Sequence, residues 1–136
     1  MIPFRLVLQP GIPLHEQVAF AAKKAMMSGR LRPGEPFPSV RTLSRELKIH
    51  VNTAQRVVAA LTQEGLLEVR PGIGTVVCQP APARRSDRGR VLGPEVDQLV
   101  VEAMKMGLTL EDLQETVEER WRRLQPERAA AKANQP

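Results

Sequence analysis

Residues 38–65 read PSVRTLSRELKIHVNTAQRVVAALTQEG, and this stretch predicts two short helices joined by a tight turn. Ser39 can start the first helix, because its hydroxyl can accept a hydrogen bond from an amide of the first turn. The apolar residues of that helix recur at the spacing of one helical face: Val40, Leu43 and Leu47. Residues 48–50 then interrupt the pattern, so the first helix is short and amphipathic.

The second helix is predicted from about Val51 to Glu64, and Gly65 ends it. Its apolar face consists of Ala54, Val57, Val58 and Leu61. At about 100° per residue, the opposite face consists of Asn52, Arg56, Ala59 and Gln63, with Thr53 and Gln55 on its flanks. The helix can therefore pack on one side and offer polar side chains on the other.

The segments before and after the helix pair also have predictable structure. A preceding helix is predicted over residues 13–29, and a proline-rich ordered loop follows over residues 31–38. After the pair, β-type runs at 66–70 and 75–78 flank Pro-Gly-Ile-Gly, which indicates a hairpin. A helix-turn-helix followed by a hairpin is a winged helix-turn-helix, whose second helix enters the major groove of DNA. We therefore expect a mainly α fold with a small β-hairpin.

The polar residue types on the second helix suit contacts with double-stranded DNA. Asn52 and Gln55 can pair with adenine edges, and Arg56 can pair with guanine or a phosphate. Thr53 can contact a phosphate or a thymine methyl group. Ser39 stands at a helix N-terminus, where backbone amides can face a phosphate oxygen.

The glycines of the hairpin, Gly72 and Gly74, would let its tip pass close to a sugar–phosphate backbone, although they could also form an ordinary turn. A Gly-x-Gly pair alone is a weak nucleotide-binding signal, and no Lys-Ser/Thr or third glycine follows at the needed spacing. The sequence contains no recognisable pairing of a nucleophile with a base. We therefore expect neither an enzyme nor a cofactor.

The composition agrees with a DNA-binding protein. The 136 residues include 20 Lys+Arg and 15 Asp+Glu, giving a net charge of +5 and a pI of about 10.1. The charge is +5 over residues 1–80, +3 over 81–90 and −3 over 91–136. One cysteine and two histidines exclude an internal disulfide framework and most zinc sites. No apolar run approaches a membrane span, so a cytoplasmic location is expected.

This uneven charge predicts two units with different tasks. The winged unit is expected over residues 1–78, a linker over 79–90, a helical dimerisation unit over 91–125 and a disordered tail over 126–136. The linker is rich in proline and arginine, and its prolines and glycine oppose regular structure. Its arginines could simply be solvated, or could contact phosphates or the minor groove: Arg84, Arg85, Arg88 and Arg90.

Two helices are predicted in the dimerisation unit. Pro94 opens the first, which ends near Gly107 and has an apolar face that includes Val96, Leu99 and Val100. The second begins at Thr109, with Asp112 placed to complete a capping box. Its apolar residues are spaced 3, 4, 4 and 3 apart: Leu110, Leu113, Val117, Trp121 and Leu124. Such a seam packs against another helix, either within one chain or between two chains.

Several stretches together resemble one protein family. They read PLHEQ (13–17), GRLRPGEPFPSVRTLS (29–44), Asn52-Thr53 followed by Arg56, LTQEGLL (61–67) and GIGTVV (72–77). They resemble the GntR family of bacterial transcription regulators over residues 13–77. The resemblance implies DNA contacts by Ser39 and Arg41, by the start of the second helix over residues 50–56, and by the glycine hairpin.

Two positions depart from the family pattern. Because of them, the resemblance does not assign which DNA bases the protein reads. Val51 stands where many members have a polar, basic or proline residue, and His50 stands where Ser, Thr or Asn usually caps the helix. The remaining chain is too short for the ligand-binding domains of other members. It resembles the short YtrA-type branch, in which a helical pair serves dimerisation, and no effector is identified.

Structural alternatives exist for individual residues. His50 could cap a helix or contact DNA, and Arg41 could pair with Glu46 or Glu35 instead of DNA. Arg56 is placed on the solvent side by periodicity alone. Cys78 suits a small strand residue better than a redox sensor.

The sequence thus predicts a homodimeric, sequence-specific DNA-binding regulator. Its simplest action is to repress transcription by occupying an inverted-repeat operator whose half-sites lie about one helical turn apart, or a multiple of that. The alternative is a protein-interaction module in which the winged unit serves only as a scaffold.

Overall fold

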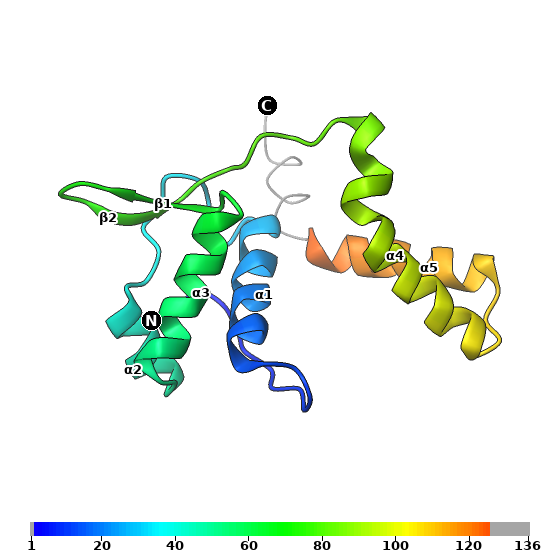
Figure 1. Cartoon of the computed structure of the whole chain (residues 1–136), viewed down its shortest axis with the longest axis horizontal. Helices are drawn as coiled ribbons and strands as arrows, with labels where there is room; N and C mark the ends of the chain where they lie inside the picture. Colours follow the sequence, from blue (N-terminus) through cyan, green and yellow to red (C-terminus); the bar gives the residue numbers. More distant parts are fainter. Residues whose placement is uncertain (1, 126–136) are drawn as a thin grey trace. The chain divides into compact units, whose positions relative to one another are not determined.

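The computed structural model describes residues 2–125, and the tail predicted over residues 126–136 lies outside this described part. The elements, in chain order, are α1 (Leu14–Met27), α2 (Val40–Leu47), α3 (Val51–Gln63), β1 (Leu67–Arg70), β2 (Gly74–Val77), the short 3₁₀ helix η1 (Arg85–Asp87), α4 (Arg88–Lys105) and α5 (Leu110–Leu124) (Figure 1). By their contacts, residues 2–80 form one compact unit and residues 81–124 form another.

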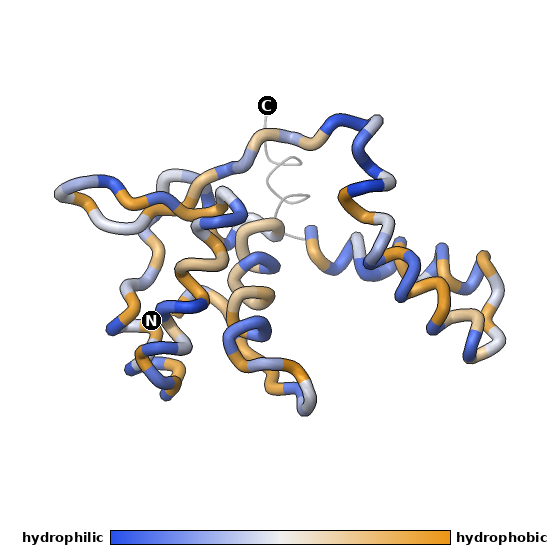
Figure 2. Tube along the Cα trace, in the orientation of Figure 1, coloured by the Kyte–Doolittle hydropathy of each residue, from blue (hydrophilic) through white to orange (hydrophobic). Residues whose placement is uncertain are grey.

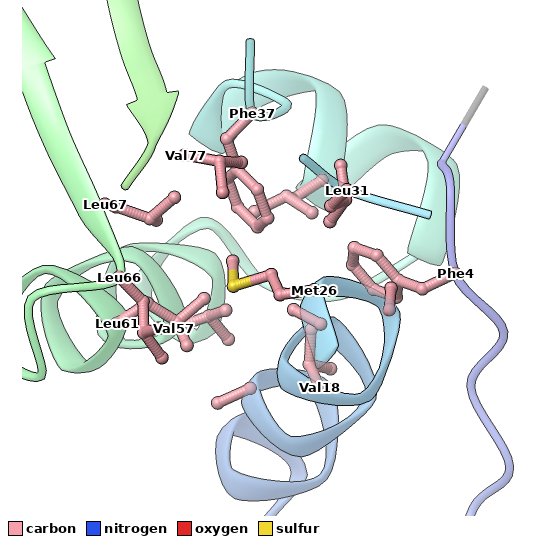
Figure 3. Packing of buried hydrophobic residues seen from close by; sticks show 14 of the residues in the cluster. Phe4, Val18, Met26, Leu31, Phe37, Val57, Leu61, Leu66, Leu67 and Val77 are labelled. Carbon is pink, nitrogen blue, oxygen red and sulfur yellow. The ribbon is translucent and has the colours of Figure 1, made fainter. Parts of the chain in front are cut away.

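The core of the first unit lies between α1, α2 and α3. All three helices contribute fully buried side chains to it: Val18, Ala22, Leu43, Ala54, Val57 and Leu61. Figure 3 shows Met26 of α1 reaching toward the space between α3 and the hairpin, where Val57, Leu61, Leu67 and Val77 belong to the same core cluster. Aliphatic packing dominates, and the two buried phenylalanines, Phe4 and Phe37, stack with ring centroids 6.3 Å apart.

The turn between α2 and α3 confirms the predicted helix-turn-helix. Lys48 adopts the left-handed conformation at φ 55° and ends α2. Ile49 is buried and anchors the turn in the core. The hydroxyl of Ser44 donates a 2.7 Å hydrogen bond to the carbonyl of Ile49, while the Ile49 amide donates to the carbonyl of Ser44 at 3.1 Å. These bonds hold the start of α3 against the end of α2.

The hairpin forms the predicted wing. Antiparallel pairing runs from Leu67 opposite Val77 to Arg70 opposite Gly74. The turn closes through the Ile73 amide, which donates to the Arg70 carbonyl at 3.0 Å. Pro71 followed by Gly72 at φ 77° suits a type II turn, which needs a positive φ at its third residue.

The proline-rich loop also pairs with β2, which the sequence patterns did not predict. The Phe37 amide donates to the Thr75 carbonyl, and the Val77 amide donates to the Glu35 carbonyl, each at 2.9 Å. Because this loop leads directly into α2, the wing is tied by backbone hydrogen bonds to the segment that carries Ser39.

In the second unit, α4 begins earlier than predicted. The sequence placed its start at Pro94, but the helix runs from Arg88 and contains Pro94 in its interior. The predicted linker is non-helical only until residue 84, because its own prolines stand at positions 80 and 82. Arginine is a good helix former, and the Arg90 guanidinium pairs with the Asp87 carboxylate at 3.3 Å across the first turn. The expectation of a linker without regular structure was therefore wrong for residues 85–90.

The predicted start of α5 is confirmed. The Thr109 amide donates to the Asp112 carboxylate at 2.9 Å, and the Asp112 amide donates to the Thr109 hydroxyl at 3.1 Å. These reciprocal bonds are a capping box. The chain reverses direction between α4 and α5 through Gly107, which has φ 73° (Figure 1). No helix among the described residues is both long and apolar enough to cross a membrane.

Candidate nucleic-acid interface

The polar side of α3 is free of the core, as predicted. Asn52, Gln55 and Arg56 are exposed, and Thr53 is half-buried. None of these side chains takes part in an ion pair or side-chain hydrogen bond within the described residues. The opposite face of the same helix packs into the core, with Ala54, Val57 and Leu61 buried and Val58 half-buried. The start of α3 therefore offers amide and guanidinium donors to solvent.

Ser39 caps α2 as the sequence predicted. Its hydroxyl oxygen accepts a 3.1 Å hydrogen bond from the Thr42 amide. The residue is exposed, so the hydroxyl and the first-turn amides lie at the surface. Arg41 is also exposed and forms no ion pair in the described part of the chain, so the predicted alternative pairing with Glu46 or Glu35 is not observed.

His50 has the capping role that was one of its two predicted alternatives. Its Nδ1 accepts a 3.0 Å hydrogen bond from the Asn52 amide, and its backbone is extended just before α3. The imidazole is exposed, so the cap leaves the other edge of the ring open to solvent. A DNA contact by this residue stays a prediction.

The hairpin tip presents its backbone and one apolar side chain. Gly72 has φ 77° and Gly74 has φ 110°, and a Cβ at either position would meet no atom within 4 Å. The glycines are therefore required by backbone conformation rather than by crowding inside this chain. Ile73, between them, is 71% exposed. The sequence did not predict its exposure, because the two glycines indicate only the conformation of the backbone at the tip.

A recess between α2 and the first turn of α3 was also not predicted. It measures about 450 Å³ and is lined by Val40, Arg41, Ser44, Arg45 and Val51. Helical periodicity could have indicated Arg45, which lies one turn after Arg41 on the exposed side of α2. Nothing in the sequence pattern showed that Val51 would be exposed, because its spacing from Ala54 matches the buried face.

Cys78 follows β2 directly and is half-buried. Desolvation, together with a hydrogen bond to Glu68, raises the pKa of the Cys78 thiol. The neighbouring Arg70 guanidinium, at 2.7 Å from the Glu68 carboxylate, lowers the pKa of Glu68. A raised pKa reduces the thiolate fraction, which supports the structural role predicted for this cysteine over a redox role.

Comparisons with known proteins agree with this geometry. Residues 14–77 match the family model described as "Bacterial regulatory proteins, gntR family". These residues are a GntR-family helix-turn-helix domain. The match begins with α1 and ends with β2, so it contains the helix pair and the whole wing of the GntR domain.

Similarity to individual relatives extends beyond the GntR-family domain. The HTH-type transcriptional repressor YtrA of Bacillus subtilis (strain 168) is 29% identical over 108 residues, which are 79% of this chain and 83% of that protein. The uncharacterized HTH-type transcriptional regulator YhcF of the same organism is 27% identical over 80% of this chain and 90% of that protein. The similarity to YtrA-type regulators thus includes most of both chains.

Solved structures share the fold. A structure titled as a transcriptional antiterminator from Listeria monocytogenes EGD-e has a TM-score of 0.78 at 17% identity, covering 89% of this chain and 91% of that one. YtrA from Sulfolobus acidocaldarius, a GntR-family transcription factor, has a TM-score of 0.58 at 22% identity, covering 71% of this chain and 96% of that one. The winged helix fold is therefore that of GntR regulators.

These findings establish the general function. The chain is a DNA-binding transcriptional regulator with a GntR-family helix-turn-helix domain over residues 14–77, and such regulators are a non-enzymatic class. Within the described residues, no group of three or more His, Cys, Asp or Glu side chains is arranged to hold a metal ion.

Proposed function

We propose that this protein is a homodimeric repressor that occupies an inverted-repeat operator and blocks transcription. The exposed polar side of α3, opposite the side that packs into the core, carries this proposal. Asn52, Gln55 and Arg56 would read base edges in the major groove, while Ser39 and Arg41 would bind phosphates. The repressive direction is suggested by the name of the B. subtilis relative YtrA.

The wing supplies a second proposed contact. The exposed tip around Gly72 and Gly74 would lie along the sugar–phosphate backbone beside the helix-turn-helix. The hydrogen bond from the Phe37 amide to the Thr75 carbonyl of β2 connects the wing to the segment that leads into α2. Phosphate contacts from both parts would make affinity fall steeply with salt concentration.

The second unit supports the proposed homodimer. Ala103 is the one buried residue within residues 81–124, and most large apolar side chains there are exposed. The proposed dimer contacts are Val96, Leu99, Val100, Leu110, Leu113, Val117, Trp121 and Leu124. Figure 2 shows apolar residues repeated along both α4 and α5. Two helices that share so little core are only marginally stable in water unless another apolar surface covers them. A second copy of the chain carries an identical apolar surface that can do so.

A random-sequence DNA selection with the full chain tests this function. We expect one enriched palindrome, because two equal reading heads select two equal half-sites. Enrichment of an unpaired half-site would contradict the dimer. No enrichment would overturn the proposal and favour the protein-interaction alternative, in which the winged unit is only a scaffold.

Variants then separate the proposed contacts in gel-shift titrations. Asn52→Ala or Gln55→Ala should lose about 1–3 kcal/mol of preference for the operator over other sequences. Arg41→Ala should weaken binding to all sequences and lower the salt slope by about two, because the dimer loses one phosphate contact in each half-site. Arg120→Ala, an exposed arginine on α5, is the matched control and should bind as wild type. Unchanged operator binding in both variant classes would show that the contact assignment is wrong.

A further inference from the structure

The recess between α2 and α3 combines apolar and cationic side chains at the surface of the DNA-binding unit. Val40 and Ser44 are half-buried within it, whereas Arg41, Arg45 and Val51 are exposed. The two arginines lie one turn apart on α2, and Val51 is the first residue of α3. The lining of the recess thus combines two aliphatic side chains with two arginines.

Val51 is not needed by the core. Its side chain is 46% exposed, although Ala54, three residues later on the same helix, is fully buried. Ile49, two residues earlier, is buried and supplies the apolar anchor of the turn. A single exposed valine is ordinary on a protein surface. This one is distinguished by its position in the first turn of the helix whose N-terminal residues face the bases in a helix-turn-helix.

We infer that Val51 recognises the 5-methyl group of a thymine in the major groove, while Arg41 and Arg45 bind phosphates beside it. This inference rests on the proposed function. Thymine alone among the four bases presents a methyl group there, and an aliphatic side chain can contact that group but cannot hydrogen-bond to a base edge. The positive charge of the two exposed arginines in the lining matches the negative charge of the flanking DNA backbone.

The expected gain in DNA affinity from the methyl contact is modest but measurable. Removing one methyl group from water improves a binding constant by about fourfold when the contact is complete. With one such contact in each half-site of a palindrome, the two effects multiply to roughly fifteenfold. Thr53 also carries a methyl group and is half-buried on the same helix, so the experiment must distinguish it from Val51.

Replacing thymine by deoxyuridine tests the inference directly. Deoxyuridine keeps the base pair and its hydrogen-bonding edge and lacks only the 5-methyl group. Each thymine of the selected operator is replaced in turn, and the Kd of the full chain is measured by fluorescence anisotropy. We expect one position per half-site at which the replacement weakens wild-type binding by about fourfold.

Val51→Ala should remove this discrimination and bind the thymine and deoxyuridine operators equally. Alanine is the best helix former, so the variant keeps α3 intact, which far-UV circular dichroism checks. The matched control is Thr53→Ser, which removes a methyl group from the neighbouring position and keeps the hydroxyl. It should retain the discrimination of wild type.

The outcomes separate the inference from the proposed function. A failed operator selection would reject the proposed function itself. An operator that binds well but shows no effect of deoxyuridine, or an effect that persists in Val51→Ala, would overturn the inference alone. Loss of discrimination in Thr53→Ser instead would assign the methyl contact to Thr53 and also overturn it.

Arg45→Ala provides an independent readout. It should weaken binding to operator and non-operator DNA alike and reduce the slope of log Kd against log salt by about two, because each subunit of the dimer loses one phosphate contact. Arg5→Ala, an exposed arginine in the N-terminal segment, is the control and should leave the slope unchanged. An unchanged slope in Arg45→Ala would remove this residue from the proposed site.

Discussion

Ser39 combines a structural bond with a proposed DNA contact. Its hydroxyl accepts from the Thr42 amide, while the residue stays exposed at the start of α2. Because the N-terminus of a helix favours negative charge, the same end suits a phosphate. A loss of DNA binding in an alanine variant could therefore come from either role.

Two substitutions at Ser39 separate these roles. Ser39→Ala should lower the free energy of unfolding by about 1 kcal/mol, because the cap is lost. Ser39→Asp should keep the cap and stay close to wild type in urea denaturation. Its carboxylate should nevertheless repel phosphates and weaken DNA binding. Equal DNA binding by Ser39→Asp and wild type would contradict a phosphate at this position.

Asp112 makes the stability of α5 depend on pH. The Thr109 amide, and then its hydroxyl, hold the pKa of the Asp112 carboxyl below its usual value of 3.8. The folded-state pKa of Asp112 lies below the unfolded-state pKa. The stabilisation of the fold by the Asp112 carboxylate is therefore complete at pH values above 3.8, and it is lost as the pH falls through the folded-state pKa.

Asp112→Ala should therefore melt at a lower temperature than wild type at pH 7. The difference should shrink as the pH falls below the usual aspartate range, and circular dichroism at several pH values measures it. Glu111→Ala removes a neighbouring acid that takes no part in the capping box, and it is the control. A difference that stays constant down to acid pH would show that the carboxylate is not the stabilising form.

Among the helices, α4 contains the residues with the least preference for helical structure. Pro94 lies inside it and has no amide to donate to the carbonyl four residues earlier. Gly89 and Gly93 add backbone freedom in the same two turns, and a Cβ at either would meet no atom within 4 Å. The first two turns of α4 therefore form against local preference.

Pro94→Ala should stabilise α4 by up to about 3 kcal/mol, because it restores a hydrogen bond and relieves the ring clash. Gly89→Ala is the matched control and should give about 1 kcal/mol. Thermal unfolding followed by far-UV circular dichroism measures both. A Pro94→Ala protein with no gain in helix content or stability would contradict a continuous α4 from Arg88.

For the whole molecule, the exposed apolar surface of α4 and α5 determines the expected assembly. Trp121 is 64% exposed and belongs to the apolar seam of α5. Leu113 is half-buried in the same seam. Aromatic side chains of this size commonly carry much of the energy of an interface.

Trp121→Asp should convert the proposed dimer into monomers. A loss of about 2 kcal/mol or more would weaken association at least roughly thirtyfold. Leu113→Asp should have the same effect, although its partial burial means that folding must be checked. Sedimentation velocity gives the oligomeric state, with Arg122→Asp on the same helix as the control. An intact dimer of the Trp121→Asp variant would contradict the proposal that the apolar seam of α5 forms the dimer interface.

Patterns within a few residues predicted most of the DNA-binding unit. The caps at Ser39 and Thr109, the buried face of α3 and the hairpin around Gly72 all follow from local spacing, and the structure confirms them. Short-range patterns work here because helix faces, caps and tight turns depend on residues at most a few positions apart.

Other features depend on contacts between distant parts of the chain or on surroundings that spacing does not describe. The exposure of Val51 follows from how α2 and the turn pack, although its spacing indicated burial. The pairing of Glu35 with Val77 joins residues more than forty positions apart. The helix through Pro94 runs against the local signal that predicted a start there. The amino-acid order thus specified the elements and their polar faces, whereas three-dimensional packing determined which side chains stay exposed, because burial depends on neighbours that are remote along the chain.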